Sequence, residues 1–119
     1  MSFDVEEKRG VHVVRVLDPK LTYPLLGSFF SDLKRLVESG AHLVALDLAA
    51  VTYLDSAAIG CLMDIHRLLK EAGGVVRLFG LQPRVRTMIS MTGVLRIVEA
   101  HEDEADALQA FAAQGGKEG

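Results

Sequence analysis

The chain contains few of the residues that form disulfides and metal sites. Among its 119 residues the only cysteine is Cys61, so the chain can form neither an intrachain disulfide nor a thiolate metal cluster. A single cysteine fits a reducing compartment, and we expect a cytoplasmic protein. The histidines stand singly, without H-x-x-x-H or H-E-x-x-H spacing, so we expect neither a metal site nor a cofactor.

Long apolar runs and an excess of basic residues are also missing. No stretch approaches the roughly 18 to 20 apolar residues that a bilayer crossing requires, and the start lacks a positive leader followed by an apolar segment. Thirteen basic and sixteen acidic residues give a formal charge of −3, which favours neither nucleic acid nor an anionic membrane as a partner. Aromatic residues make up 6% and tryptophan is absent, so aliphatic side chains must fill the core.

The apolar pattern that is present predicts alternating strands and helices. The order ββαβαβαβα indicates an α/β fold, in which a mixed, mostly parallel sheet follows an initial hairpin and is covered by helices. We expect one domain over residues 1–113 and a disordered tail over 114–119. The predicted strands are 3–9, 11–17, a segment from Ala41 to Ala50, 75–79 and 95–98, and the predicted helices are 23–39, 56–72, 83–92 and 102–111.

The segment Tyr53 to Gly60, YLDSAAIG, is the most specific part of the sequence, because it joins a buried strand to a helix. Asp55 and Ser56 can each cap the helix start by accepting a hydrogen bond from a free backbone N–H. Structural capping alone explains both residues. A helix start also tolerates an anion, however, and a phosphate on Ser56 would add roughly −1.5 to −2 charges there. The segment therefore fits either a plain helix cap or a phosphorylation switch.

These residues resemble the STAS domain family, and within it the bacterial anti-sigma-factor antagonists. The resemblance covers nearly the whole chain and is carried by the strand ending in Asp47, the motif L-D-S-A-A-I-G from Leu54 to Gly60, and the helix that follows it. Supporting matches are V-L-D at 16–18 and M-I-S-M-T-G-V-L-R-I-V at 88–98. The resemblance implies a small α/β regulatory protein that is not an enzyme.

The same resemblance implies a function in partner exchange. The unphosphorylated form would bind an anti-sigma factor, itself a GHKL-type serine kinase, and so release a sigma factor. Phosphorylation of Ser56 would abolish the binding, a separate phosphatase would reset the serine, and the free chain would be a monomer. The residues implied to contact the partner are Asp18, Asp55, Ser56, Ala57, Ala58, Ile59 and Gly60.

The chain departs from the family pattern in two places. Arg15 stands where a glycine is common, and Pro19 follows Asp18, so this edge of the docking surface would be reshaped. Ala57 and Ala58 follow Ser56 where the family often has Ser-Gly. Ser56 is therefore the only hydroxyl of the motif that could accept a phosphate.

Other functions find less support in the sequence. A serine hydrolase would need a base beside Ser56, but no G-x-S-x-G elbow is present and His66 lies roughly 15 Å further along the same helix. Met63, Met88 and Met91 could form an adaptable docking patch, although core packing fits Met63 and Met88 better. Two other functions of the same fold stay open: a subunit of a lipid-transport ATP-binding-cassette complex, and a component of a stress-signalling assembly.

Overall fold

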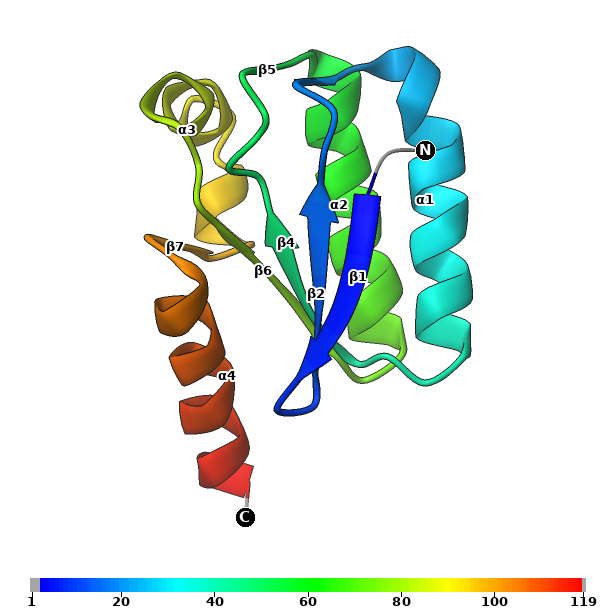
Figure 1. The fold of residues 1–119 in the computed structure, drawn as a ribbon, viewed down its shortest axis with the longest axis vertical. Coiled ribbons are helices and arrows are strands. Elements are labelled where there is room, and N and C mark those ends of the chain that lie inside the picture. The colour runs from blue at the N-terminus through cyan, green and yellow to red at the C-terminus, as the bar shows by residue number, and fades with distance from the viewer. Residues whose placement is uncertain (1–2, 119) are drawn as a thin grey trace.

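The computed structural model describes residues 3–118 and the side chains of residues 3–113. Its centre is a five-stranded sheet in the order β1-β2-β4-β6-β7 (Figure 1). The first two strands, β1 (Phe3–Lys8) and β2 (Val11–Val16), form the predicted antiparallel hairpin. Parallel pairing then joins β2 to β4 (Leu43–Asp47), β4 to β6 (Val75–Phe79) and β6 to β7 (Ala100–His101). The expected mixed, mostly parallel sheet is confirmed.

Helices cover both faces of this sheet. On one face lie α1 (Tyr23–Glu38) and α2 (Ser56–Glu71), side by side, while α4 (Glu104–Glu118) packs on the other (Figure 1). The short helix α3 (Pro83–Ser90) lies beyond the carboxyl ends of the parallel strands. Because β2, β4 and β6 are parallel, their carboxyl ends lie at the same edge of the sheet, and the loops that lead into the following helices gather there.

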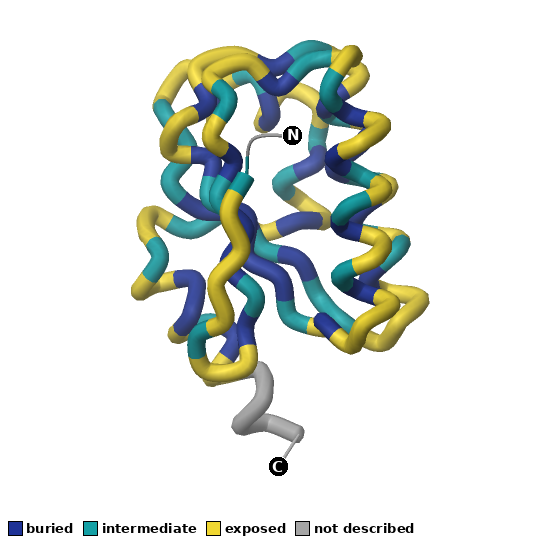
Figure 2. Tube along the Cα trace, turned by 45° about the vertical axis from the view of Figure 1, so that its right-hand side comes forward, coloured by how far each residue is buried: buried dark blue, intermediate teal, exposed yellow. Residues whose placement is uncertain are grey.

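The main core lies between the sheet and the α1/α2 pair. The inward residues of the central strands, such as Val44, Leu46 and Leu78, are fully buried, and they pack against apolar stripes of both helices. Figure 2 shows the resulting pattern, with buried turns facing the sheet and exposed turns facing outward. The buried residues of the two stripes are Leu26, Phe29, Leu33 and Val37 on α1, and Ala58, Cys61, Leu62, Ile65 and Leu69 on α2.

A smaller apolar cluster joins the opposite face of the sheet to α4. Ala107, Leu108 and Phe111 of this helix pack against alternate strand residues, among them Val13 and Ala45. Charged side chains surround the cluster. Arg15 on β2 forms ion pairs with Glu6, Asp47 and Glu104, and Lys8 pairs with Glu104 as well.

One glycine is required by close backbone packing. A Cβ on Gly74, just before β6, would lie 2.1 Å from the carbonyl oxygen of His42. No side-chain rotation can relieve a clash with backbone. The Gly73-Gly74 pair therefore ends α2 and lets β6 begin directly beside β4.

The predicted strand at 95–98 is wrong. Residues Val94–Arg96 form a 3-10 helix that begins after Gly93, whose φ is +81°, and β7 follows it at Ala100–His101. The apolar run buries Val94 and Val98, four positions apart, so both side chains reach the core from one helical turn. Sequence alone did not separate this spacing from that of a short strand.

Two further differences concern short elements and the last helix. The structure adds two unpredicted strands, β3 (Lys20–Leu21) and β5 (Tyr53–Leu54), which pair with each other. The last helix begins at Glu104 instead of residue 102, because the carboxylate of Asp103 accepts a hydrogen bond from the Asp106 amide and caps the helix. The same helix continues past its predicted end at residue 111 to Glu118. Residue 119 and the side chains of residues 114–118 lie outside the described residues, and the domain boundary and the disordered tail stay predictions.

Candidate partner-binding site

The start of α2 is held at the carboxyl edge of the sheet by the loop that precedes it. After β4 the chain buries Leu48 and Val51 completely and then forms β5. Leu54, at the end of β5, is also buried, and α2 begins two residues later. Every third residue of this connection is therefore fixed in the core, which leaves the helix start little freedom to move.

Pairing between β3 and β5 brings the Asp18 region beside this loop. The carbonyl oxygen of Pro19 accepts hydrogen bonds from the Thr52 amide at 2.8 Å and the Thr52 hydroxyl at 3.1 Å. At the end of β5, the backbone amide of Asp55 donates a hydrogen bond to the carbonyl oxygen of Leu21 at 3.4 Å. Two segments more than thirty residues apart in the sequence thus form one surface at the top of the molecule in Figure 1.

Asp55 caps two helices at once. Its Oδ1 accepts from the amide of Ala58 in the first turn of α2, and its Oδ2 accepts from the amide of Tyr23 at the first residue of α1, each at 2.9 Å. The hydrogen bond from Tyr23, followed by that from Ala58, lowers the pKa of this carboxyl below its ordinary value. Because both of its oxygens accept backbone bonds, Asp55 sets the relative position of the two helix starts.

Ser56 is the first residue of α2 and is exposed. Within the described residues its hydroxyl forms no hydrogen bond, whereas the hydroxyls of Ser28, Ser39 and Ser90 each donate to the carbonyl three residues earlier. Capping of α2 is performed by Asp55, which leaves the Ser56 hydroxyl available. The plain helix-cap interpretation therefore accounts for Asp55 but leaves Ser56 without a structural role.

The other residues named from the sequence fall into two groups. Ala57 and Gly60 are exposed and Ile59 is half-buried, so these three share the surface of the helix start with Ser56. Ala58 is fully buried and packs in the core, so it supports the helix start from beneath. Asp18 is half-buried, and its Oδ2 finds no hydrogen-bond partner among the residues described.

Arg15 does not lie on this surface. Its guanidinium donates to Asp47 at 3.0 Å and forms the ion pairs with Glu6 and Glu104 on the α4 face of the sheet. These three carboxylates, Glu6 first, raise the pKa of Arg15 further above its ordinary value. The departure from the family pattern at this position therefore strengthens the α4 face and does not add a charge beside Ser56.

Sequence reasoning missed an apolar hollow that borders Ser56. The hollow lies between the start of α2 and the end of α3 and is lined by Leu54, Asp55, Ser56, Ile59, Met88, Met91 and Thr92. We call it the α2–α3 hollow. Met63 and Met88 pack against the core as expected, but Met91 is 82% exposed. The signal available in the sequence was the placement of Met91 outside the apolar stripe of α3.

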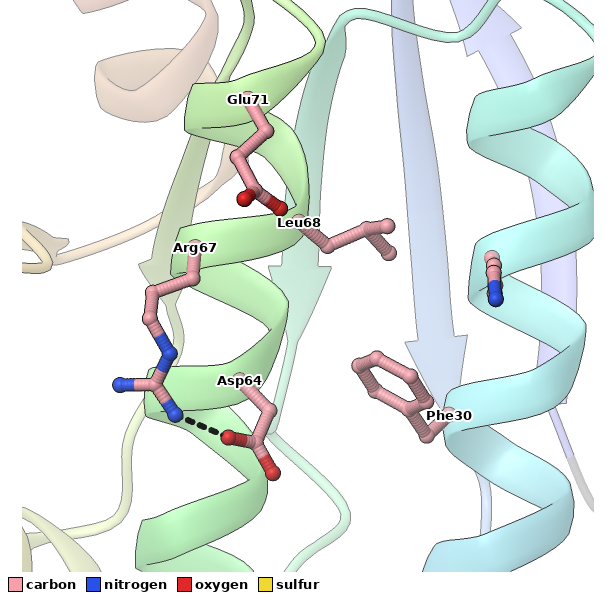
Figure 3. Close-up of a pocket in the computed structure, with 6 residues that line it drawn as sticks. Phe30, Asp64, Arg67, Leu68 and Glu71 are labelled. Atoms are coloured by element: carbon pink, nitrogen blue, oxygen red, sulfur yellow. Dashed lines mark hydrogen bonds and ion pairs between the residues drawn. The ribbon is translucent and has the colours of Figure 1, made fainter.

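A second groove runs between α1 and α2 and has a different character. Phe30 and Leu68 point toward each other across it (Figure 3), and its other lining residues are the charged Lys34, Asp64, Arg67 and Glu71. Arg67 and Asp64 form an ion pair along its rim. This α1–α2 groove therefore offers charges of both signs, whereas the α2–α3 hollow offers almost none.

The described residues offer neither a metal site nor a membrane span. In that part of the chain no three His, Cys, Asp or Glu side chains gather closely enough to hold a metal ion. No helix there is both long and apolar enough to cross a membrane.

Comparison with known proteins assigns the fold. Residues 2–107 match the STAS domain family. The chain belongs to this family. A curated relative, the anti-sigma F factor antagonist of Paenibacillus polymyxa, is 25% identical over 115 residues, which cover 91% of this chain and 92% of the relative.

Two similar proteins of known structure have the same fold. An anti-sigma factor antagonist from Mycobacterium paratuberculosis superposes with a TM-score of 0.81 at 24% identity, covering 92% of each chain. The Bacillus cell fate determinant SpoIIAA in its phosphorylated form superposes with a TM-score of 0.69 at 18% identity, covering 92% of this chain and 99% of that one. The STAS fold of this chain thus extends over nearly the full length of both.

Proposed function

We propose that this STAS domain is an anti-sigma-factor antagonist, a regulatory binding protein with no catalytic residue of its own. The observation that carries the proposal is the free, exposed hydroxyl of Ser56 on a helix start that another residue already caps. The relative from Paenibacillus polymyxa, which aligns over nine-tenths of the chain and is named for this function, supports it.

Ser56 is the phosphoacceptor in this proposal. The anti-sigma factor, a GHKL-type serine kinase, transfers the γ-phosphoryl group of ATP to Ser56 Oγ. The bond between that phosphorus and the β,γ-bridging oxygen breaks, ADP leaves, and the hydroxyl proton passes to a base of the kinase. A separate phosphatase hydrolyses the phosphoserine and restores the binding form.

Electrostatics supports such a switch at this position. Asp55 is the only charged residue that lines the hollow beside Ser56, and its carboxylate already accepts two backbone hydrogen bonds. A phosphate adds roughly −1.5 to −2 charges beside that carboxylate. The helix N-terminus tolerates the anion, so the fold persists, but a partner docked there must desolvate it. Phosphorylation therefore acts on binding and not on folding.

The proposal is tested with the GHKL-type anti-sigma kinases encoded in the same genome, each purified and mixed with this chain and ATP. We expect one of them to add a single phosphate to the wild-type chain and none to Ser56→Ala, as read by mass spectrometry. Ser31→Ala is the matched control, because Ser31 is also an exposed helical serine. Equal phosphorylation of the wild type and Ser56→Ala would refute the assignment.

Binding provides a second measurement of the same proposal. Ser56→Asp places a permanent charge at the docking surface, and we expect its affinity for that kinase to fall at least about tenfold, which corresponds to about 1.4 kcal/mol. Calorimetry on the wild type, Ser56→Asp and Ser31→Asp would show the change only at position 56.

A further inference from the structure

The α2–α3 hollow, with a volume of about 420 Å³, is the concave surface that Ser56 itself lines. Ile59 and Met88 form part of its wall from two different helices, and both pack against the main core. Leu54, beneath them, is buried. The base of the hollow is therefore held in place by the same core that positions α2.

The chemistry of the lining favours an uncharged occupant. Asp55 is the only charged residue in it, and both of its carboxylate oxygens accept backbone hydrogen bonds. The remaining side chains are aliphatic or thioether groups and two hydroxyls. Removing such surface from water is favourable, at roughly 25 cal/mol per Å², only if the occupant is apolar too.

Met91 forms the wall of the hollow that is open to solvent. It follows the last residue of α3 and is the most exposed of the large hydrophobic residues, at 82%. Single exposed apolar side chains are common on protein surfaces, so exposure alone indicates nothing. The relevant observation is that Met91 and Ser56 line the same hollow, and that the flexible side chain of Met91 can close over an occupant.

We infer that the α2–α3 hollow receives one apolar side chain of the anti-sigma factor, and that Met91 is the residue that closes over it. This inference rests on the proposed function. Interfaces commonly depend on a few anchor side chains that fill desolvated pockets. Ser56 lies at the rim of this pocket, so a phosphate there stands beside the anchor. An apolar anchor cannot neutralise the dianion, and phosphorylation thus removes the anchor from its pocket.

The α1–α2 groove does not fit the same occupant. Four of its six lining residues are charged, and Asp64 and Arg67 already pair with each other. An apolar side chain placed there would have to separate or bury those charges. The α1–α2 groove and the α2–α3 hollow therefore differ in what they can bind, and of these two only the α2–α3 hollow includes Ser56.

The experiment compares variants at two exposed apolar residues. We expect Met91→Glu to lose at least about tenfold in affinity for the anti-sigma kinase that phosphorylates the wild type, and Met91→Leu to stay within about threefold of the wild type. Ile97→Glu is the matched control, because Ile97 is 51% exposed and lies outside the hollow. Both glutamate variants replace exposed side chains, and circular dichroism verifies that each is folded.

The outcomes separate the inference from the proposed function. If Met91→Glu binds like the wild type while Ser56→Asp binds weakly, the inference is overturned and the proposed function stands. If the wild-type chain binds no anti-sigma kinase of its genome, the proposed function fails and takes the inference with it. If Met91→Glu changes self-association in light scattering and not the affinity for the kinase, the hollow belongs to a contact between copies of this chain, which also overturns the inference.

Discussion

The two faces of the sheet are held to their helices in different ways. On one face, an apolar core without any buried charged side chain joins the strands to α1 and α2. On the other, three residues of α4 make a small apolar contact, and ion pairs from Lys8 and Arg15 to Glu104 fasten the first turn of the helix.

This difference bears on the switch, because α2 begins at Ser56 and belongs to the continuous core. Apolar burial grows with contact area and does not depend on pH, whereas partly exposed ion pairs contribute little and are lost in acid. The structure therefore separates a firmly packed layer that presents Ser56 from an α4 layer that can loosen first. Regions with few buried apolar contacts are those that open at lowest free energy.

The largest expected effect comes from removing equal side chains on the two faces. Leu46→Ala, on the α1/α2 face, leaves a cavity in a fully buried site and should lower the free energy of unfolding by about 2–5 kcal/mol. Leu108→Ala, on the α4 face, removes a side chain at the margin of the smaller cluster, and a smaller loss is expected because the site is less enclosed and can collapse around the missing atoms.

Urea unfolding measures both changes, and hydrogen exchange locates them. Leu108→Ala should speed exchange in α4 while α2 keeps the protection of the wild type. The rate of Ser56 phosphorylation should be unchanged in this variant. Equal losses of stability in the two variants, or faster exchange in α2 of Leu108→Ala, would contradict the two-layer description.

Acid provides a smaller and more selective perturbation of the α4 face. The hydrogen bond from Lys8, followed by that from Arg15, lowers the pKa of Glu104 below its ordinary value of 4.5. A carboxyl whose pKa is lowered by folding stabilises the fold while it is ionised. That stabilisation is fully present above about pH 4.5 and is lost as the pH falls through the lowered pKa.

Glu104→Gln tests this contribution. At pH 7 the variant should be less stable than the wild type by less than about 1 kcal/mol, since the pair is partly exposed. The difference should shrink as the pH falls through the lowered pKa of Glu104 and the wild-type carboxyl becomes protonated. Glu102→Gln is the matched control, because Glu102 is exposed and forms no ion pair within the described residues. A stability difference that persists in acid would show that Glu104 acts through packing and not through charge.

Sequence reasoning reached the regular elements more easily than the contacts between them. The helices over α1 and α2 and the strand β6 follow from apolar spacing, because a buried face imposes its period on the sequence. The L-D-S motif likewise located the helix start. The double capping by Asp55 was not predictable, since its second partner, the Tyr23 amide, lies 32 residues away.

The α2–α3 hollow could not be predicted either, because it also depends on contacts between residues far apart in the sequence. It is formed by α2 and α3, and nothing in the local sequence around Met91 states which helix start it will face. The prediction for residues 94–96 was wrong for a different reason. The apolar run there is too short for its sequence to distinguish the period of a 3-10 helix from that of a strand. Long-range pairing, such as that of β3 with β5, decides these features.

The smallest expected effect is on the alkylation rate of Cys61, which reports on how tightly the α1/α2 layer is packed. Cys61 lies on α2, its side chain is buried, and burial, assisted by Asp64, raises its thiol pKa to about 11. Only the thiolate reacts, so alkylation by iodoacetamide at pH 8 should be far slower than for a free thiol. Mass spectrometry can follow the rate of alkylation.

Leu46→Ala should speed the alkylation of Cys61, because that variant weakens the packing around α2. Leu108→Ala should leave the rate close to that of the wild type. Fast alkylation of the native wild type would mean that the α1/α2 layer opens readily, and Ser56 would then be carried by a mobile helix and not by a fixed one.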